Sequence, residues 1–180
     1  MPDEASLPPS GRSLDRLWAG WRSAYVNAPE APPGQGSIFR RILEAGLSDK
    51  EAYIVWRGEL TFALLNAYPY GSGHLLVMPY REVAELEDLT EAEAAELWSA
   101  VHDAVRAIKA AYRPDGINLG MNLGAAAGAG VPSHLHVHVL PRWIADSNFT
   151  TAVAETRVLP EALTDSWQRL HAAWPTEGSD

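Results

Sequence analysis

The stretch HLHVHVL (134–140) places a histidine at every second position. In a β-strand the side chains alternate between the two faces of the sheet, so the three imidazoles would share one face. These are His134, His136 and His138. The aliphatic residues between them would point into a core, and they are Leu135, Val137 and Val139. The pattern predicts a strand with one apolar face and one imidazole face.

Three interpretations of this histidine row are open. An ordinary exposed strand face can carry imidazoles that have no function. Imidazoles at alternate positions of a strand can also bind zinc, because neutral imidazole is a good metal ligand. Finally, a neutral imidazole is a competent nucleophile, and its neighbours can donate hydrogen bonds to phosphate oxygens. The third chemistry would be phosphoryl or nucleotidyl transfer.

The residues before the row favour phosphate over a cation. The segment LGAAAGAGVPS (123–133) contains no Asp, Glu or Cys that could join a metal site. Backbone N–H groups of such a glycine-rich loop can form an anion-binding nest. The loop by itself is weak evidence, because small residues also mark an ordinary tight turn.

Composition narrows the class of protein. The chain has 180 residues, a net charge of −9 and no cysteine, so we expect no disulfides and no thiolate zinc site. The acidic balance argues against non-specific binding to nucleic acid or to an anionic membrane. The polar, proline-containing start lacks the apolar region of a signal peptide, and no apolar run approaches a membrane span. We therefore expect a cytoplasmic protein.

Hydrophobic periodicity predicts the elements that position the histidines. Helices are expected at 14–26, 37–46, 90–108 and 160–174, with Thr90 and Glu93 forming a capping box for the longest. Strands are expected as a pair within 52–66 around a turn near 57–59, and then at 74–79, 117–122 and 134–141; residues 150–158 are compatible with another. This order predicts an α+β fold: a mostly antiparallel five-stranded sheet with one long helix and a shorter terminal helix.

We predict a single domain. Residues 1–13 form a disordered lead, and the domain spans 14–180. Within it, 14–36 supply an N-terminal helix and a Pro/Gly linker, 37–143 the catalytic core, and 144–180 a C-terminal extension.

The motif HLHVHVL resembles the His-φ-His-φ-His-φ-φ signature of the histidine triad (HIT) superfamily, where φ is apolar. Two further stretches match in order and spacing: LLNAYPYGSGHLLVMPYR (64–81) and GINLGMNLGAAAGAG (116–130). The chain is most similar to the bacterial branch that includes diadenosine tetraphosphate phosphorylases. The resemblance extends from about residue 37 to residue 143.

This resemblance implies four catalytic histidines. His136 would be the nucleophile that attacks the α-phosphorus and forms a nucleotidyl-histidine intermediate. His134 and His138 would flank it, orient its ring and contact phosphate or leaving-group oxygens. His74 would lie beside the triad, although its residue type also suits a buried structural histidine.

The resemblance also implies the substrate contacts. Asn66 would reach the ribose and Asn122 the phosphate side, while Phe39 and Leu65 would wall the base pocket. The loop backbone at Gly128, Ala129 and Gly130 would cradle phosphate. Apart from the resemblance, the position of Trp143 just after the triad strand suggests that its indole walls the phosphate pocket and donates a hydrogen bond. Simpler roles remain open, because Asn66 could form a turn and Phe39 could be core.

Three positions depart from the family pattern. Many relatives carry zinc-binding cysteines where this chain has Ser37 and Arg40. We therefore expect no metal site and no tightly bound cofactor, and Mg²⁺ only as a companion of a polyphosphate substrate. Gly130 lies where the phosphorylases lead us to expect a hydroxyl, which predicts a weak hold on phosphate.

The predicted activity is nucleotidyl transfer on adenine nucleotides or dinucleoside polyphosphates, led by phosphorolysis of diadenosine tetraphosphate to ADP and ATP. A HIT-type nucleotide hydrolase or phosphoramidase is the enzymatic alternative, and a nucleotide-binding protein with little turnover is the alternative of another class. The partner is thus a small nucleotide. Relatives are usually homodimers, so we expect a homodimer or homo-oligomer, for which the apolar helix near 94–108 offers either a seam or core.

Overall fold

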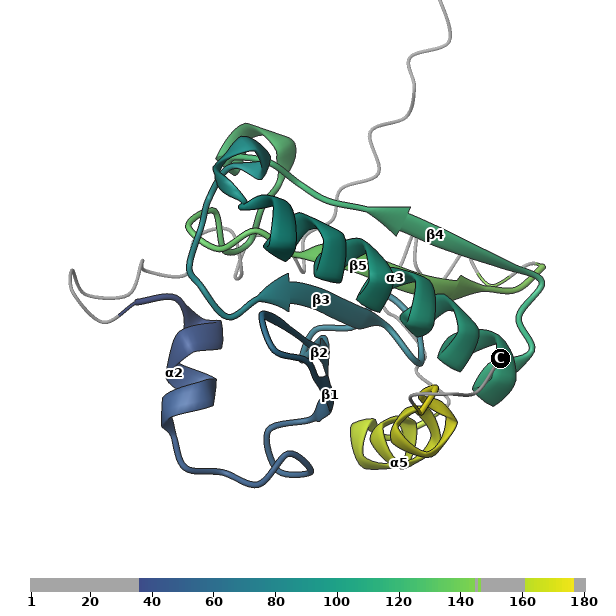
Figure 1. The fold of residues 1–180 in the computed structure, drawn as a ribbon. Helices are drawn as coiled ribbons and strands as arrows, with labels where there is room; N and C mark the ends of the chain where they lie inside the picture. The colour runs from purple at the N-terminus through teal and green to yellow at the C-terminus, as the bar shows by residue number, and fades with distance from the viewer. Residues whose placement is uncertain (1–35, 145, 147–160, 177–180) are drawn as a thin grey trace, which may run out of the picture.

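The computed structural model describes residues 36–144, 146 and 161–176 (Figure 1). The helices are α2 (Ile38–Glu44), α3 (Glu91–Tyr112) and α5 (Leu163–Ala173), with two 3-10 turns, η1 (Leu86–Asp88) and η2 (Ala125–Ala127). The strands are β1 (Ile54–Arg57), β2 (Thr61–Leu65), β3 (Leu75–Pro79), β4 (Gly116–Gly120) and β5 (Val137–Arg142). The predicted α+β fold class is confirmed. The predicted disordered lead, the helix at 14–26, nearly all of the linker and the strand at 150–158 lie outside the described residues.

The five strands form one antiparallel sheet in the order β1-β2-β3-β5-β4. Strand β5 lies inside the sheet, between β3 and β4, and of the three histidines of the row it carries His138. Its ladder begins at Val137, three residues later than predicted. The chain before it is held differently, because the N–H of Leu135 donates to the carbonyl of Val83 at 2.7 Å.

Helix α3 runs across the sheet (Figure 1), and its capping box is present as predicted. The Thr90 side chain accepts from the Glu93 N–H, and the Glu93 side chain accepts from the Thr90 N–H. Arg81 also pairs with Glu93 and holds the pKa of that carboxyl at about 2. The apolar face of α3, which includes Leu97 and Ile108, is buried against the sheet. This face is therefore intramolecular core rather than a seam for a partner.

The two faces of the sheet have different surroundings. One face packs against α3 and α5 and includes the apolar residues of the histidine stretch, Leu135, Val137 and Val139. The other face has a smaller cluster that α2 covers with Phe39, formed with Ala52, Ile54, Phe62, Leu64, Leu76 and Met78. The histidines belong to this second face, as the alternation predicted.

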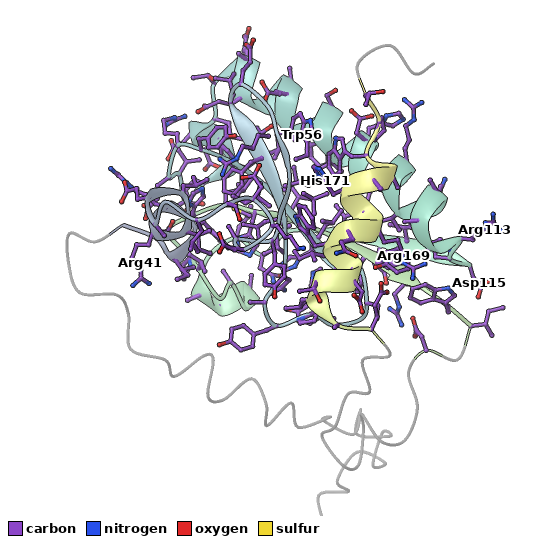
Figure 2. The ribbon with its side chains drawn as sticks, turned by 90° about the horizontal axis from the view of Figure 1, so that it is seen from below. Arg41, Trp56, Arg113, Asp115, Arg169 and His171 are labelled. Carbon is purple, nitrogen blue, oxygen red and sulfur yellow. The ribbon has the colours of Figure 1, made fainter. Side chains whose placement is uncertain are left out.

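Helix α5 closes the β1 end of the sheet. The indole N–H of Trp167 donates to the carbonyl of Ile54 at 2.8 Å, and Nδ1 of His171 donates to the carbonyl of Val55 at 2.9 Å. Figure 2 shows His171 on the side of α5 that faces β1, with Trp56 close by. These bonds satisfy two successive carbonyls at an irregularity of the β1–β2 ladder. No helix within the described ranges is long and apolar enough to cross a membrane.

Candidate active site

The central histidine of the row, His136, is held in one neutral protonation state. Its Nδ1 lies 2.8 Å from the backbone carbonyl of His134. A carbonyl can only accept a hydrogen bond, so Nδ1 carries the proton and Nε2 keeps its lone pair. The side chain is 4% exposed, and this burial is the main cause that lowers its pKa below the ordinary 6.5. At neutral pH His136 is therefore an uncharged imidazole with Nε2 available for attack.

The first histidine, His134, has both ring nitrogens engaged. Nε2 donates to the carbonyl of Pro79 at 2.8 Å, and Nδ1 accepts from the Ser37 hydroxyl at 2.6 Å. The residue is fully buried, and burial is the main cause that lowers its pKa. Because these bonds direct the ring toward the protein, the structure points to His134 as a support for His136 rather than as a second nucleophile.

The third histidine, His138, forms a pair with His74. The Tyr70 N–H donates to Nδ1 of His74 at 3.1 Å, so the proton of this neutral ring is on Nε2. That Nε2 donates to Nδ1 of His138 at 2.9 Å. A neutral His138 then carries its own proton on Nε2, where it can donate a hydrogen bond. The structure thus brings His74, 64 residues away in sequence, to the triad.

Aromatic rings cover the histidines. Phe39 of α2 contacts His134 and His136 edge-on, with ring centroids 5.4 and 5.3 Å apart. Tyr70 stacks on His138, with centroids 5.8 Å apart. The row is thus not an exposed strand face: His134 and His136 are buried, and only His138 is partly exposed. A low-dielectric surrounding of this kind strengthens each hydrogen bond around the nucleophile.

Sheet register decides which leucine lies on the histidine face. Leu64 pairs with Leu76, and Leu76 pairs with His138, so these three side chains form a row across the sheet. Leu65 instead packs beneath α3 on the opposite face. The predicted contribution of Leu65 to a pocket beside the histidines is therefore corrected: the structure places Leu64 there. The error arose because one step along a strand reverses the face.

The same row continues from His138 into β4, where its partner is Gly120. A side chain built at Gly120 would meet nothing within 4 Å. Space is therefore open beside the partly exposed His138. Asn122 follows two residues after Gly120 and is partly buried, so the structure places it near the end of β4 that meets the histidines.

Asn66 forms a local turn in this structure. Its Oδ1 accepts from the Tyr68 N–H at 2.9 Å, and its Nδ2 lies 3.4 Å from Nδ1 of His74. The side chain is only partly buried. The turn role considered from the sequence is thus present, and the residue is also adjacent to the histidine cluster. Its contact with a ribose stays a prediction.

The glycine-rich loop directs some of its amides onto itself. The Gly128 N–H donates to the Ala125 carbonyl at 3.0 Å, and the Ala129 N–H donates to the Gly124 carbonyl at 3.4 Å. Gly128 adopts a left-handed conformation with φ of 87°, which favours glycine. A phosphate bound by Gly128, Ala129 and Gly130 would have to compete with these loop bonds, and the longer one is the easier to replace.

Trp143 and its neighbour Arg142 lie away from the triad. Trp143 is five residues beyond His138, roughly 16 Å along an extended chain, and it contacts Tyr112 of α3. Arg142 donates to Asp146 at 2.6 Å and to Asn118 at 2.8 Å. The structure therefore does not place Trp143 at the histidines. The sequence suggested it through adjacency, but an extended strand separates residues that are close in number.

The residues near α2 do not fit a zinc ion. The Ser37 hydroxyl is bonded to His134, and the Arg40 guanidinium pairs with Glu44. Neither side chain is a thiolate, and arginine is not a metal ligand. Among the residues that the structure describes, no group of three histidine or carboxylate side chains is arranged to hold a metal ion.

Several site residues were not found from the sequence. The Ser37 hydroxyl, the Pro79 carbonyl and the Tyr70 amide set the ring protonation states, and Leu64 shares the histidine face. Pattern reasoning could have found Leu64, because it lies two residues before Asn66 on a strand. Backbone contacts leave no signal in residue type, so the carbonyl and the amide could not be found.

Comparison with known proteins matches residues 48–143 to the HIT domain family. A relative from Mycobacterium tuberculosis (strain ATCC 25618 / H37Rv), named AP-4-A phosphorylase, is 44% identical over 167 residues, which cover 89% of this chain and 85% of that protein. A protein from Schizosaccharomyces pombe, named bis(5'-nucleosyl)-tetraphosphatase (asymmetrical), is 38% identical over 52% of this chain and 50% of its own length.

Solved structures share the fold. The crystal structure of a Hit-like protein from Bartonella henselae, described as involved in cell-cycle regulation, superimposes with a TM-score of 0.62 at 25% identity. The match covers 76% of this chain and 95% of that chain. The described fold is therefore that of a known group of structures.

The neutral state of His136 predicts the pH profile. Protonation would occupy Nε2 and abolish attack, and the lowered pKa means that this occurs below pH 6.5. We expect kcat/KM for diadenosine tetraphosphate to stay level as the pH falls from 7.5 to 6.5, and to decline only at lower pH. A rate profile between pH 4.5 and 8 measures this, and a decline centred above pH 6.5 would contradict it.

The register predicts a difference between two adjacent leucines. Leu64→Ala and Leu65→Ala each remove a buried side chain and should each lower stability by about 2–5 kcal/mol. Only Leu64 lies on the histidine face. We expect Leu64→Ala to weaken AMP binding at least about five-fold, and Leu65→Ala to leave it within about two-fold. Calorimetry on both folded variants tests the assignment, and equal losses of affinity would refute it.

Proposed function

Because the chain belongs to the HIT domain family, we propose that it transfers an adenylyl group through His136 and splits diadenosine tetraphosphate with phosphate, giving ADP and ATP. The M. tuberculosis relative, 44% identical over 89% of this chain, supports this choice through its name. The supporting observation in the molecule is the 2.8 Å bond from Nδ1 of His136 to the His134 carbonyl. That bond leaves Nε2 free to attack.

In the first step, the Nε2 lone pair of His136 forms a bond to the α-phosphorus. The bond from this phosphorus to the bridging oxygen breaks, and ATP departs. The imidazole becomes positively charged, and its Nδ1–H bond to the His134 carbonyl strengthens as charge develops. His138 donates from Nε2 to a phosphate or leaving oxygen, in the protonation state that His74 imposes.

In the second step, an oxygen of inorganic phosphate attacks the adenylyl group on His136. The nitrogen–phosphorus bond breaks, ADP forms and the neutral imidazole returns. Water in place of phosphate would give AMP. The S. pombe relative named tetraphosphatase, 38% identical over half of this chain, makes hydrolysis the second candidate. The two reactions share the covalent step and differ only in the acceptor.

The substrate contacts are part of the proposal. The ribose binds at Asn66, and the base lies against Phe39 and Leu64. The phosphates lie near Asn122 and the loop 128–130, with Mg²⁺ as part of the polyphosphate substrate and no cofactor held by the protein. Gly130 offers no hydroxyl there, so phosphate binds weakly. We place the reaction in the cytoplasm, where ATP and ADP are available.

The proposal is tested by the products formed with diadenosine tetraphosphate. With phosphate, we expect ADP and ATP in equal amounts, and with ¹⁸O-labelled phosphate the label should appear in the β-phosphate of ADP. Without phosphate, the rate should fall steeply. If AMP and ATP form at the same rate with or without phosphate, the enzyme is a hydrolase.

His136→Asn is the control for the covalent step. Asparagine lacks the nucleophilic nitrogen, so turnover should fall on the order of a thousand-fold or more. Circular dichroism and AMP affinity should stay close to those of the original chain. Near-normal turnover in a folded His136→Asn protein would exclude the nucleophile assignment.

We also propose that two copies of the chain associate through strand β4. This strand lies at the edge of the sheet, and Leu119 on it is 52% exposed. An edge strand presents backbone groups that can pair with another strand, whereas the apolar face of α3 is already buried. Light scattering should give twice the chain mass of 19.6 kDa, and Leu119→Arg should shift the protein toward monomer. A monomer at micromolar concentration in the original chain would refute this.

A further inference from the structure

Ser37 lies on a different element from the histidines and is bonded to the first of them. Its Oγ is 2.6 Å from Nδ1 of His134, 97 residues away in sequence, and both side chains are buried. Ser37 precedes α2, which lies outside the range 48–143 that matches the family. The contact therefore joins a segment outside the matched domain to the catalytic row.

The direction of this hydrogen bond follows from the other side of the ring. Nε2 of His134 faces the Pro79 carbonyl, which can only accept. Burial lowers the pKa of His134 and keeps the ring neutral, so the single ring proton is on Nε2. Nδ1 is then an acceptor, and the Ser37 hydroxyl donates to it.

Ser37 is held in place by two further bonds. Its Oγ accepts from the Arg40 N–H at 3.2 Å, as the N-cap of α2. Its backbone N–H donates to Glu82 at 2.8 Å. The Ser37 oxygen accepts a hydrogen bond from the Arg40 amide, and its single hydroxyl proton is therefore available to donate to His134. Ser37 thus fixes the start of α2 and the ring of His134 together.

This arrangement reaches the nucleophile by two routes. The carbonyl of His134 accepts the proton of His136, so a shift of His134 moves the acceptor that sets the nucleophile's protonation state. Helix α2 also carries Phe39, whose ring contacts His134 and His136. Loss of the Ser37 bond would loosen both the His134 carbonyl, which accepts the His136 proton, and the Phe39 ring, which covers the two histidines.

We propose that Ser37 is a positioning residue for the nucleotidyl transfer, and that its hydroxyl acts through His134 to hold His136 in the attacking geometry. The inference rests on the proposed function for its kinetic part. Ser37 does not touch the substrate in this proposal, so its effect falls on kcat more than on KM. A purely structural N-cap would instead lower stability without altering the ring nitrogens.

The kinetic test compares Ser37→Ala, Ser37→Gly and Ser37→Thr in the full chain. Glycine is a tolerated N-cap that lacks the hydroxyl, so it separates loss of the His134 bond from loss of the helix cap. We expect kcat for diadenosine tetraphosphate to fall about ten-fold in the alanine and glycine variants, the size of one lost hydrogen bond. The KM should stay within about two-fold, and Ser37→Thr should recover most of the rate.

Thr90→Ala is the matched control, because Thr90 also caps a helix with its hydroxyl but bonds Glu93 instead of a histidine. Its kcat should remain within about two-fold of the original chain. If Thr90→Ala lowers kcat as much as Ser37→Ala, loss of a helix cap accounts for the effect and the proposal is wrong.

Nitrogen-15 spectra of the histidine rings supply a readout that needs no turnover. In the original chain, Nδ1 of His134 should show the shift of an unprotonated nitrogen that accepts a hydrogen bond. In Ser37→Ala and Ser37→Gly, the chemical shift of His134 Nδ1 should move to the value of an unprotonated nitrogen that accepts no hydrogen bond. The Nδ1 proton of His136 should exchange faster with water. Because no substrate is used, this result stands even if the enzyme does not act on diadenosine tetraphosphate.

Two outcomes would overturn the proposal. One is an unchanged Nδ1 signal of His134 in a folded Ser37→Gly protein. The other is an active enzyme in which Ser37→Ala and Ser37→Gly keep the full kcat. The second outcome would leave the nucleotidyl-transfer function intact, so the two failures can be told apart.

Discussion

The hydrogen bond from Nδ1 of His136 to the carbonyl of His134 is the constraint on which the site depends. An imidazole has one proton in its neutral form, and this bond assigns it to the nitrogen that does not react. The other nitrogen, which attacks in the proposed reaction, then needs no separate base, and burial keeps the ring uncharged at neutral pH. In the proposed reaction the same bond would stabilise the positive ring of the covalent intermediate, because a carbonyl dipole attracts the charge that attack creates.

Two further sets of contacts fix the histidines on either side of His136. On one side, hydrogen bonds to Ser37 and to the Pro79 carbonyl fix the ring of His134. The backbone carbonyl of this residue accepts the His136 proton. On the other side, Tyr70 and His74 set the proton of His138 on the nitrogen that can donate to phosphate. In the proposed reaction, the site thus combines one nitrogen that attacks with one that donates. The backbone carbonyl of His134 assigns the first, and the backbone amide of Tyr70 assigns the second through His74. Backbone groups do not titrate, so they assign the ring proton for as long as each imidazole stays neutral.

The fold separates stability from chemistry by using the two faces of one sheet. The face beneath α3 and α5 carries the larger apolar cluster, and residues such as Leu65 and Val137 lie in it. The opposite face carries the histidines and the smaller cluster under α2. Sheet strands alternate their side chains, so each strand contributes to both layers at once. His136 directly precedes β5, which is paired on both sides, and such an anchor positions a side chain more accurately than a free loop would.

The types and spacing of the residues were enough to predict the fold class, the face of the histidines and the start of α3. The period of two at the histidines sets their common face, and the capping box at Thr90 sets the start of α3, because both depend only on local geometry. The α+β order followed from the same local rules, whereas the place of His74 beside the row followed from the resemblance to the HIT superfamily. Two things depended on the tertiary structure: the proton positions on the rings and the contact of Ser37 with His134. His134 bonds to the Pro79 carbonyl and to Ser37, which is 97 residues away in sequence. Such bonds form only when distant segments of the chain pack together. The prediction that Trp143 lies beside the histidines was wrong for a related reason. An extended strand separates residues that are close in number.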